Sequence, residues 1–167
     1  HLEVEVSLCR ELAERVDVVH VLSPATATMT AEHYALPAER IVRIPHPSYQ
    51  GVYASSAERG SARAALGIAD DDRAILFFCQ MRPYKGLTDL FDAIRGLDRA
   101  TADKTVLLLA GRTRDDDLPI VEAALPENVR VVRDHSFIAD EDVDRWFRAA
   151  DVAVYPYRAI LNSGSLH

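Results

Sequence analysis

Short apolar runs alternate with helix-patterned segments through residues 74–155, and no other feature constrains the fold as strongly. Residues 74–79 are apolar throughout and residues 105–110 are apolar apart from Thr105, as strands are when both faces of a parallel sheet are covered. Residues 87–97 carry apolar side chains at the spacing of one helix face. Strands that alternate with helices form parallel sheets through right-handed crossovers. We therefore expect an α/β fold, with a Rossmann-like parallel sheet and flanking helices.

The same periodicities predict the remaining elements. Helices are expected at 8–16, 26–35, 119–125 and from Asp140 onward, and strands at 17–22, 41–44, 129–132 and 152–155. For the helix that begins at Asp140, we expect Asp140 to be the N-cap. Val143, Phe147 and Ala150 are then expected to face the core.

A change in composition divides the chain. Residues 48–60 are small and polar with little periodicity, which is typical of a linker. We expect residues 1–47 to be the end of one domain and residues 61–167 to be a second domain, incomplete at its C-terminus. A truncated sheet exposes an apolar edge, so self-association is expected.

Composition narrows the classes of partner and of cellular location. The net charge of −7 argues against a general binder of nucleic acid or of membrane surfaces, because both are anionic. No apolar run is long enough to span a bilayer, and the N-terminus shows no signal-peptide pattern. Cys9 and Cys79 are expected to be reduced and mostly buried, as in a cytoplasmic protein. No pair of histidines has metal-ligand spacing, so no metal is expected.

The loop after residues 74–79 carries the strongest chemical signal, because ligands of open α/β sheets bind beyond the carboxyl ends of the strands. Two cations, Arg82 and Lys85, precede the helix expected from Leu87. Basic side chains usually avoid the positive end of a helix dipole, so a bound anion would account for both. Gly86 lets the backbone approach a ligand closely. The pattern favours a phosphate site over two solvated cations in a turn.

Two later loops are weaker candidates. The first is Asn162-Ser163-Gly164-Ser165, whose small residues expose backbone N–H groups that can hold an anion; the alternative is an ordinary turn. In the second, Phe137 and Ile138 either contact a planar base or belong to the core. No Gly-x-Gly-x-x-Gly follows the first strand and no Walker-type loop occurs, which argues against dinucleotide and P-loop folds.

The run Phe77-Phe78-Cys79-Gln80-Met81-Arg82-Pro83-Tyr84-Lys85-Gly86 resembles the donor-domain motif of glycosyltransferase family four, also called group-one glycosyltransferases. Other segments agree in order, among them Ala110-Gly111, Tyr155-Pro156-Tyr157 and Ser163-Gly164. The resemblance implies a two-domain GT-B architecture. Its C-terminal domain would bind a nucleotide sugar, UDP- or GDP-linked, and residues 1–47 would be a remnant of the acceptor domain. It also implies transfer with retention of configuration, without a metal or another cofactor.

The resemblance assigns roles to the candidate residues. Arg82 and Lys85 would neutralise the diphosphate as the leaving group gains charge. The other implied donor contacts are Gln80, Gly86, Gly111, Phe137, Ile138, Asn162, Ser163, Gly164 and Ser165. The sequence departs from the family pattern at Cys79, where many members have glycine, and at Gln80, where many have arginine. The family's paired glutamates are not present, and Ile160 falls near the first of them.

The expected function is therefore that of a hexosyltransferase-like fragment that is inactive without its partner domain. A sugar-nucleotide epimerase or a glycoside phosphorylase of the same architecture is an alternative, since both place cations on phosphate. Those enzymes need carboxylates or a cofactor lysine that the sequence does not show. A non-catalytic nucleotide-binding module is the third interpretation.

Overall fold

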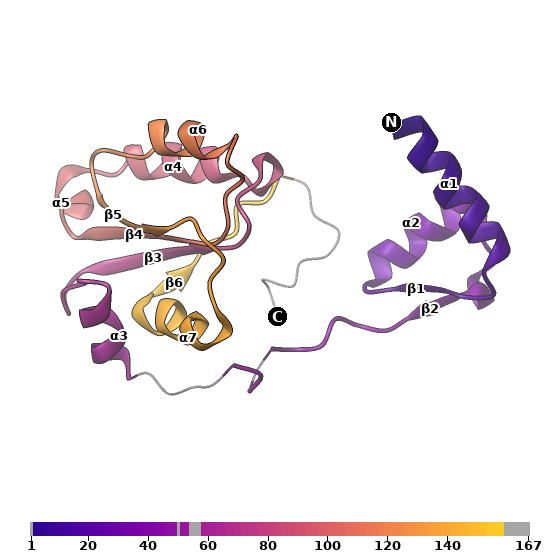
Figure 1. Cartoon of the computed structure of the whole chain (residues 1–167), viewed down its shortest axis with the longest axis horizontal. Coiled ribbons are helices and arrows are strands. Elements are labelled where there is room, and N and C mark those ends of the chain that lie inside the picture. The colour runs from indigo at the N-terminus through magenta and orange to yellow at the C-terminus, as the bar shows by residue number, and fades with distance from the viewer. Residues whose placement is uncertain (1, 50, 54–57, 159–167) are drawn as a thin grey trace. The chain divides into compact units, whose positions relative to one another are not determined.

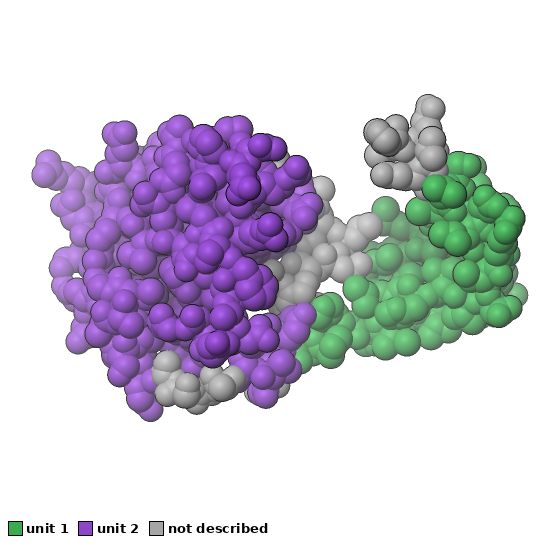
Figure 2. Space-filling view, in the orientation of Figure 1, with its two compact units in different colours: residues 1–48, 160–167 green, residues 49–159 purple. Residues whose placement is uncertain are grey.

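The computed structural model describes residues 2–49, 51–53 and 58–158 (Figure 1). The described residues form two compact units (Figure 2). The first unit contains those up to Ser48 and the second begins at Tyr49. Helix α3 (Arg59–Ala65) begins inside the segment expected to be a linker. The assignment of the first unit to an acceptor domain stays a prediction.

The first unit is a small α/β arrangement. It contains α1 (Leu2–Arg15), β1 (Val19–Val21), α2 (Pro24–Tyr34), the 3-10 helix η1 (Ala38–Arg40) and β2 (Ile41–Arg43). Strands β1 and β2 pair in parallel. Ser23 caps α2, because its hydroxyl accepts a hydrogen bond of 3.1 Å from the Thr26 N–H. The Arg40 guanidinium donates to the Ala13 carbonyl at 2.8 Å and so ties η1 to the end of α1.

The second unit is built on a parallel sheet, which confirms the predicted fold class. After α3 come β3 (Arg73–Phe78), η2 (Pro83–Lys85), α4 (Leu87–Arg95), α5 (Arg99–Ala102), β4 (Thr105–Ala110), α6 (Leu118–Ala123), β5 (Arg130–Asp134), α7 (Asp140–Ala149) and β6 (Val152–Ala153). Within residues 58–158 the strand order is β5-β4-β3-β6, with every neighbouring pair parallel.

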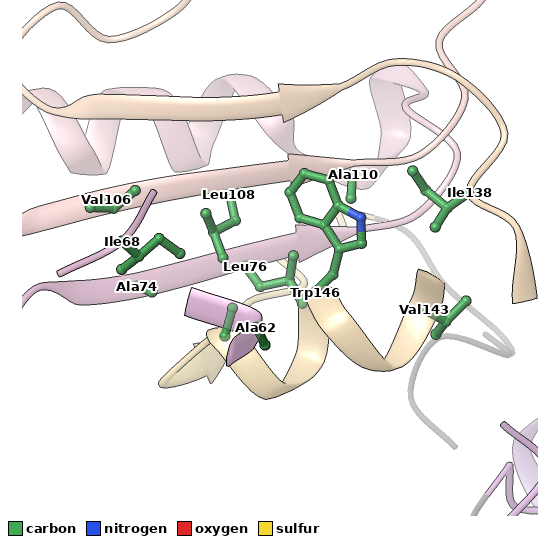
Figure 3. Packing of buried hydrophobic residues seen from close by; sticks show 11 residues of the cluster. Ala62, Ile68, Ala74, Leu76, Val106, Leu108, Ala110, Ile138, Val143 and Trp146 are labelled. Atoms are coloured by element: carbon green, nitrogen blue, oxygen red, sulfur yellow. The ribbon is translucent and has the colours of Figure 1, made fainter. Parts of the chain in front are cut away.

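Helices cover both faces of this sheet (Figure 1). Successive residues of a strand point to opposite faces. Leu76 of β3 therefore packs in a cluster with Trp146 of α7, on the face covered by α3 and α7 (Figure 3). Phe77 packs on the other face in a cluster with Phe91 of α4. All residues of β4 are buried, as the apolar run predicts for a central strand.

Two details of α7 correct the expectation. The N-cap residue is Ala139, and Asp140 is the first residue of the helix, so Asp140 is not the cap. Trp146 is 5% exposed in the core, whereas Phe147, expected inside, is 40% exposed and packs at its edge against Phe78, with ring centroids 4.9 Å apart. The core stripe runs through Val143, Trp146 and Ala149 because steps of three residues keep side chains on one helix face.

Other differences have equally local reasons. Helices α3 and α5 were not expected, because they are short and lack an apolar period. Cys79 is buried as expected, but Cys9 is exposed, as is every α1 side chain from Val6 to Leu12.

Candidate functional site

The loops that follow β3, β4 and β5 begin side by side at the carboxyl edge of the sheet. Phe78 is in register with Ala110, and Ala110 is in register with Asp134. The edge continues beyond the strands through a parallel bridge between Met81 and Thr113. The candidate residues of these loops therefore lie at the edge where open α/β sheets bind ligands.

The loop after β3 alternates between buried and exposed side chains. Cys79 and Met81 are buried, whereas Gln80 and Arg82 are exposed. The Gln80 side-chain oxygen accepts hydrogen bonds of 3.1 and 2.8 Å from Nε and Nη2 of Arg82. Gln80 thus holds the Arg82 guanidinium at the surface, a contact that the sequence did not reveal.

Lys85 ends the same loop, directly before α4. Its ammonium lies 5.3 Å from the ring centroid of Tyr157 and 6.0 Å from that of Tyr84. Beneath it, burial raises the pKa of the Cys79 thiol, and the nearby Lys85 ammonium offsets only part of this rise. Cys79 is accordingly a neutral thiol near the Lys85 ammonium.

Gly86 and Gly111 bring the loops into close contact. Gly86 has φ +71°, and a Cβ there would lie 1.8 Å from the Pro156 carbonyl oxygen. Gly111 has φ +130°, and a Cβ there would lie 2.3 Å from the Cys79 carbonyl oxygen. Both positions require glycine because of contacts within the chain itself. Their approach to a donor molecule stays a prediction.

The segment after β6 is fastened to the start of α4. The Arg158 backbone N–H donates to the Tyr84 carbonyl at 3.0 Å. The Arg158 guanidinium donates to the Asp89 carboxylate, at 2.6 Å from Nε, and this contact holds the pKa of Asp89 below its usual value. The sequence offered no signal for this pair, which is separated by 69 residues.

The two candidates in the loop after β5 differ from each other. Ile138 is 8% exposed and belongs to the cluster around Trp146, so the core interpretation holds for this residue. Phe137 is 76% exposed at the same edge of the sheet. Contact between Phe137 and a base stays a prediction. The candidates Asn162, Ser163, Gly164 and Ser165 lie outside the described residues.

The family described as glycosyl transferases group 1 matches residues 58–160, which is more than half of the chain. The chain belongs to this family. The match covers the sheet of the second unit and the edge that carries Arg82 and Lys85. No protein with a curated functional description matches the sequence.

Solved structures share the fold of this group 1 chain. HepE of Anabaena in complex with UDP aligns with a TM-score of 0.70 and 20% identity, over 92% of this chain and 42% of HepE. Sucrose-phosphate synthase of Thermosynechococcus elongatus aligns with a TM-score of 0.71 and 20% identity, over 93% and 39%. WaaG, a glycosyltransferase involved in lipopolysaccharide biosynthesis, aligns with a TM-score of 0.65 and 21% identity, over 83% and 37%. The chain thus spans about two-fifths of the length of these proteins.

A polar network that sequence reasoning missed supports two loops of the group 1 domain. The His135 ring lies between the Thr113 hydroxyl, 2.9 Å from Nδ1, and the Glu122 carboxylate, 2.8 Å from Nε2. Arg133 donates to the same carboxylate at 2.6 Å and, together with His135, holds the pKa of Glu122 below its usual value. The network ties the ends of β4 and β5 to α6.

Two further findings concern the described part of this group 1 chain. Residues 2–49, 51–53 and 58–158 contain no cluster of three or more His, Cys, Asp or Glu side chains that could hold a metal ion. In the same residues, no helix combines the length and apolar character needed to cross a membrane.

The Tyr155 hydroxyl should ionise at a higher pH than an ordinary tyrosine does. Burial raises the pKa of Tyr155 to about 12, and the neighbouring Tyr157 and Cys79 add to the rise. Unfolded tyrosine ionises near pH 10, so above that pH the unfolded chain binds fewer protons and native stability falls, by about 1–2 kcal/mol up to pH 12. Ultraviolet titration of the six tyrosines should show a late component that Tyr155→Phe removes. A titration identical in the variant would contradict the assignment.

Proposed function

We propose that this chain is the nucleotide-sugar-binding part of a glycosyltransferase that uses a UDP- or GDP-hexose donor and transfers the sugar with retention of configuration. Membership of the group 1 family supports glycosyl transfer. One observation carries the assignment of the donor site: Arg82 and Lys85 lie together at the carboxyl edge of β3, directly before α4. A diphosphate is the anion that this pair would bind at the positive end of the helix.

The two cations would act mainly on the leaving group. When the bond between sugar and nucleotide breaks, negative charge develops on the diphosphate. Arg82 and Lys85 would neutralise this charge, which lowers the barrier by electrostatic stabilisation. The guanidinium fork of Arg82 suits a bidentate contact with phosphate oxygens, whereas Lys85 supplies a point charge. The proposed mechanism needs no metal, because these side chains supply the positive charge.

UDP is the first nucleotide to consider. The structural neighbour HepE forms complexes with UDP and with UDP-glucose. The exposed ring of Phe137 is suited to stack on a planar base, and we assign it that contact. The backbone donors of Ser163, Gly164 and Ser165 would complete the hold on the diphosphate, and Gln80 would orient Arg82.

The remaining assignments concern the whole protein. The first unit would belong to the acceptor-binding domain, so transfer would require a longer protein than this chain. The full protein would act in the cytoplasm, either free or peripheral to a membrane. We also propose self-association of this chain, supported by exposed apolar side chains such as Leu8 and Leu12 on α1. Light scattering measures this directly, and a monodisperse monomer would contradict it.

Calorimetric titration with UDP and GDP tests the donor site. We expect the double variant Arg82→Ala, Lys85→Ala to bind the preferred nucleotide about a hundredfold more weakly, since two charge-assisted contacts are lost. The matched control is Arg99→Ala, Lys104→Ala. It removes the same two residue types from exposed positions before β4, at the opposite edge of the sheet. Equal losses in both variants would overturn the assignment, as would a wild-type chain that binds neither nucleotide.

A further inference from the structure

The sequence contains two lysines, Lys85 and Lys104, and the structure gives them different partners. Lys104 is paired with the carboxylate of Asp71, which raises the pKa of Lys104. Lys85 lies over aromatic rings, 5.3 Å from the centroid of Tyr157, and forms no ion pair with a carboxylate among the described residues. The two partners have opposite consequences for binding an anion.

A carboxylate beside Lys85 would neutralise its charge and compete with a phosphate. An aromatic ring attracts the ammonium through its negative face and leaves the net charge unchanged. Other N–H groups of the ammonium can then point away from the ring toward an anion. A ring is therefore a partner that can hold Lys85 in place without reducing its attraction for a diphosphate.

Contacts within the chain fix the Tyr157 ring before any ligand arrives. Its neighbour Pro156 packs against Gly86, at a distance that no Cβ would tolerate. On the other side, the Arg158 N–H bonds to the Tyr84 carbonyl at 3.0 Å. The ring also stacks edge-on with Tyr155 at 5.7 Å between centroids and with Tyr84 at 6.4 Å. Tyr157 thus occupies a preset position at the end of the loop that carries Lys85.

We propose that Tyr157 is a positioning residue that holds the Lys85 ammonium, through its ring face, in the place where it meets the donor diphosphate. The role rests on the proposed function, because it assigns the anion to a nucleotide diphosphate. Positioning by a ring lowers the entropy that Lys85 would lose on binding, and this entropy is large for a flexible side chain. The hydroxyl of Tyr157 is dispensable for this role, since the Lys85 ammonium lies over the ring and the buried hydroxyl has no hydrogen-bond partner.

Nuclear magnetic resonance of the methylated lysines tests the contact itself. Reductive methylation with a ¹³C label retains the lysine charge and adds reporter methyl groups to Lys85 and Lys104. The ring current of Tyr157 should shift the Lys85 methyl signals upfield of those of Lys104. We expect Tyr157→Phe to retain this shift and Tyr157→Leu to lose most of it. Unchanged Lys104 signals will show that a variant is folded, and nuclear Overhauser contacts from the Lys85 methyls to the Tyr157 ring test the wild type without any substitution.

Titration of the unmethylated chains with UDP tests the consequence. We expect Tyr157→Leu to weaken binding roughly tenfold and Tyr157→Phe to leave it nearly unchanged. In Lys85→Ala, adding Tyr157→Leu should cost little more, since the ring then has no ammonium to hold. If the losses of UDP affinity from Lys85→Ala and Tyr157→Leu add fully in the double variant, the positioning role is overturned. It is also overturned if the Lys85 methyl signals coincide with those of Lys104, whatever the affinity for UDP. An upfield shift in a wild-type chain that binds neither UDP nor GDP would instead overturn the proposed function and leave the ring contact standing.

Discussion

Replacing Arg63 by alanine should lower the free energy of unfolding of the second unit by about 3–5 kcal/mol. Arg63 is 2% exposed on α3, and its guanidinium donates to the backbone carbonyls of Ala149, Ala69 and Asp72 at 3.0, 2.6 and 2.6 Å. It also lies 3.5 Å from the Asp151 carboxylate. Without Arg63, these acceptors stay in a site that water reaches poorly, and each unmade hydrogen bond costs about 1–3 kcal/mol.

Arg59 provides the matched control for Arg63. It lies on the same helix and donates to the same carboxylate of Asp151 at 2.5 Å, but its side chain is about half exposed. Arg59→Ala should therefore change the unfolding free energy by less than about 1 kcal/mol. Urea unfolding followed by Trp146 fluorescence measures both variants, because the only tryptophan of the sequence lies in the core of the second unit. If both substitutions lower the free energy of unfolding equally, the burial of Arg63 does not determine its contribution to stability.

Arg63 also shows what the sequence concealed. A charged residue in a short, alanine-rich helix is usually exposed, so nothing in the pattern marked it as buried. Its importance depends on three carbonyls that come together only in the folded chain. The apolar runs of β3 and β4 were predicted closely for the opposite reason, since a strand covered on both faces is apolar at nearly every position, here at all but the first residue of each strand.

In the candidate site, too, some features were predictable from the sequence and others were not. The position of Arg82 and Lys85 before α4 followed from chain order alone, because the ends of parallel strands share an edge. The partners of these cations did not follow from chain order. Gln80 is close in sequence but was expected to contact a donor, and Tyr157 reaches Lys85 across 72 residues through the pairing of β6 with β3. Local patterns predict where a loop lies, whereas contacts between loops require the fold.

The glycine before α4 was expected to admit a ligand, and the structure adds a second requirement that leads to a strong prediction. We expect Gly86→Ala to destabilise the second unit by about 3 kcal/mol or more, since an alanine in the left-handed region costs about 1–2 kcal/mol before any overlap is counted. The Cβ would lie 1.8 Å from the Pro156 oxygen and 2.8 Å from the Pro156 carbonyl carbon, so backbone must move. The backbone at Gly86 and at Pro156 cannot move apart easily, because Arg158 binds the Pro156 segment to Tyr84 and Asp89.

Gly60→Ala is the control for this substitution, because no atom lies within 4 Å of a Cβ at Gly60 and its φ is not in the left-handed region. In helix α3 the added methyl group should be neutral or stabilise by up to about 1 kcal/mol. Trp146 fluorescence in urea measures both variants. The methyl signals of Lys85 supply a second readout, since displacement of Pro156 should carry the Tyr157 ring away and abolish the upfield shift. A Gly86→Ala variant with native stability and an unchanged Lys85 signal would mean that the loops after β3 and β6 tolerate separation, and that glycine at this position serves the donor molecule alone.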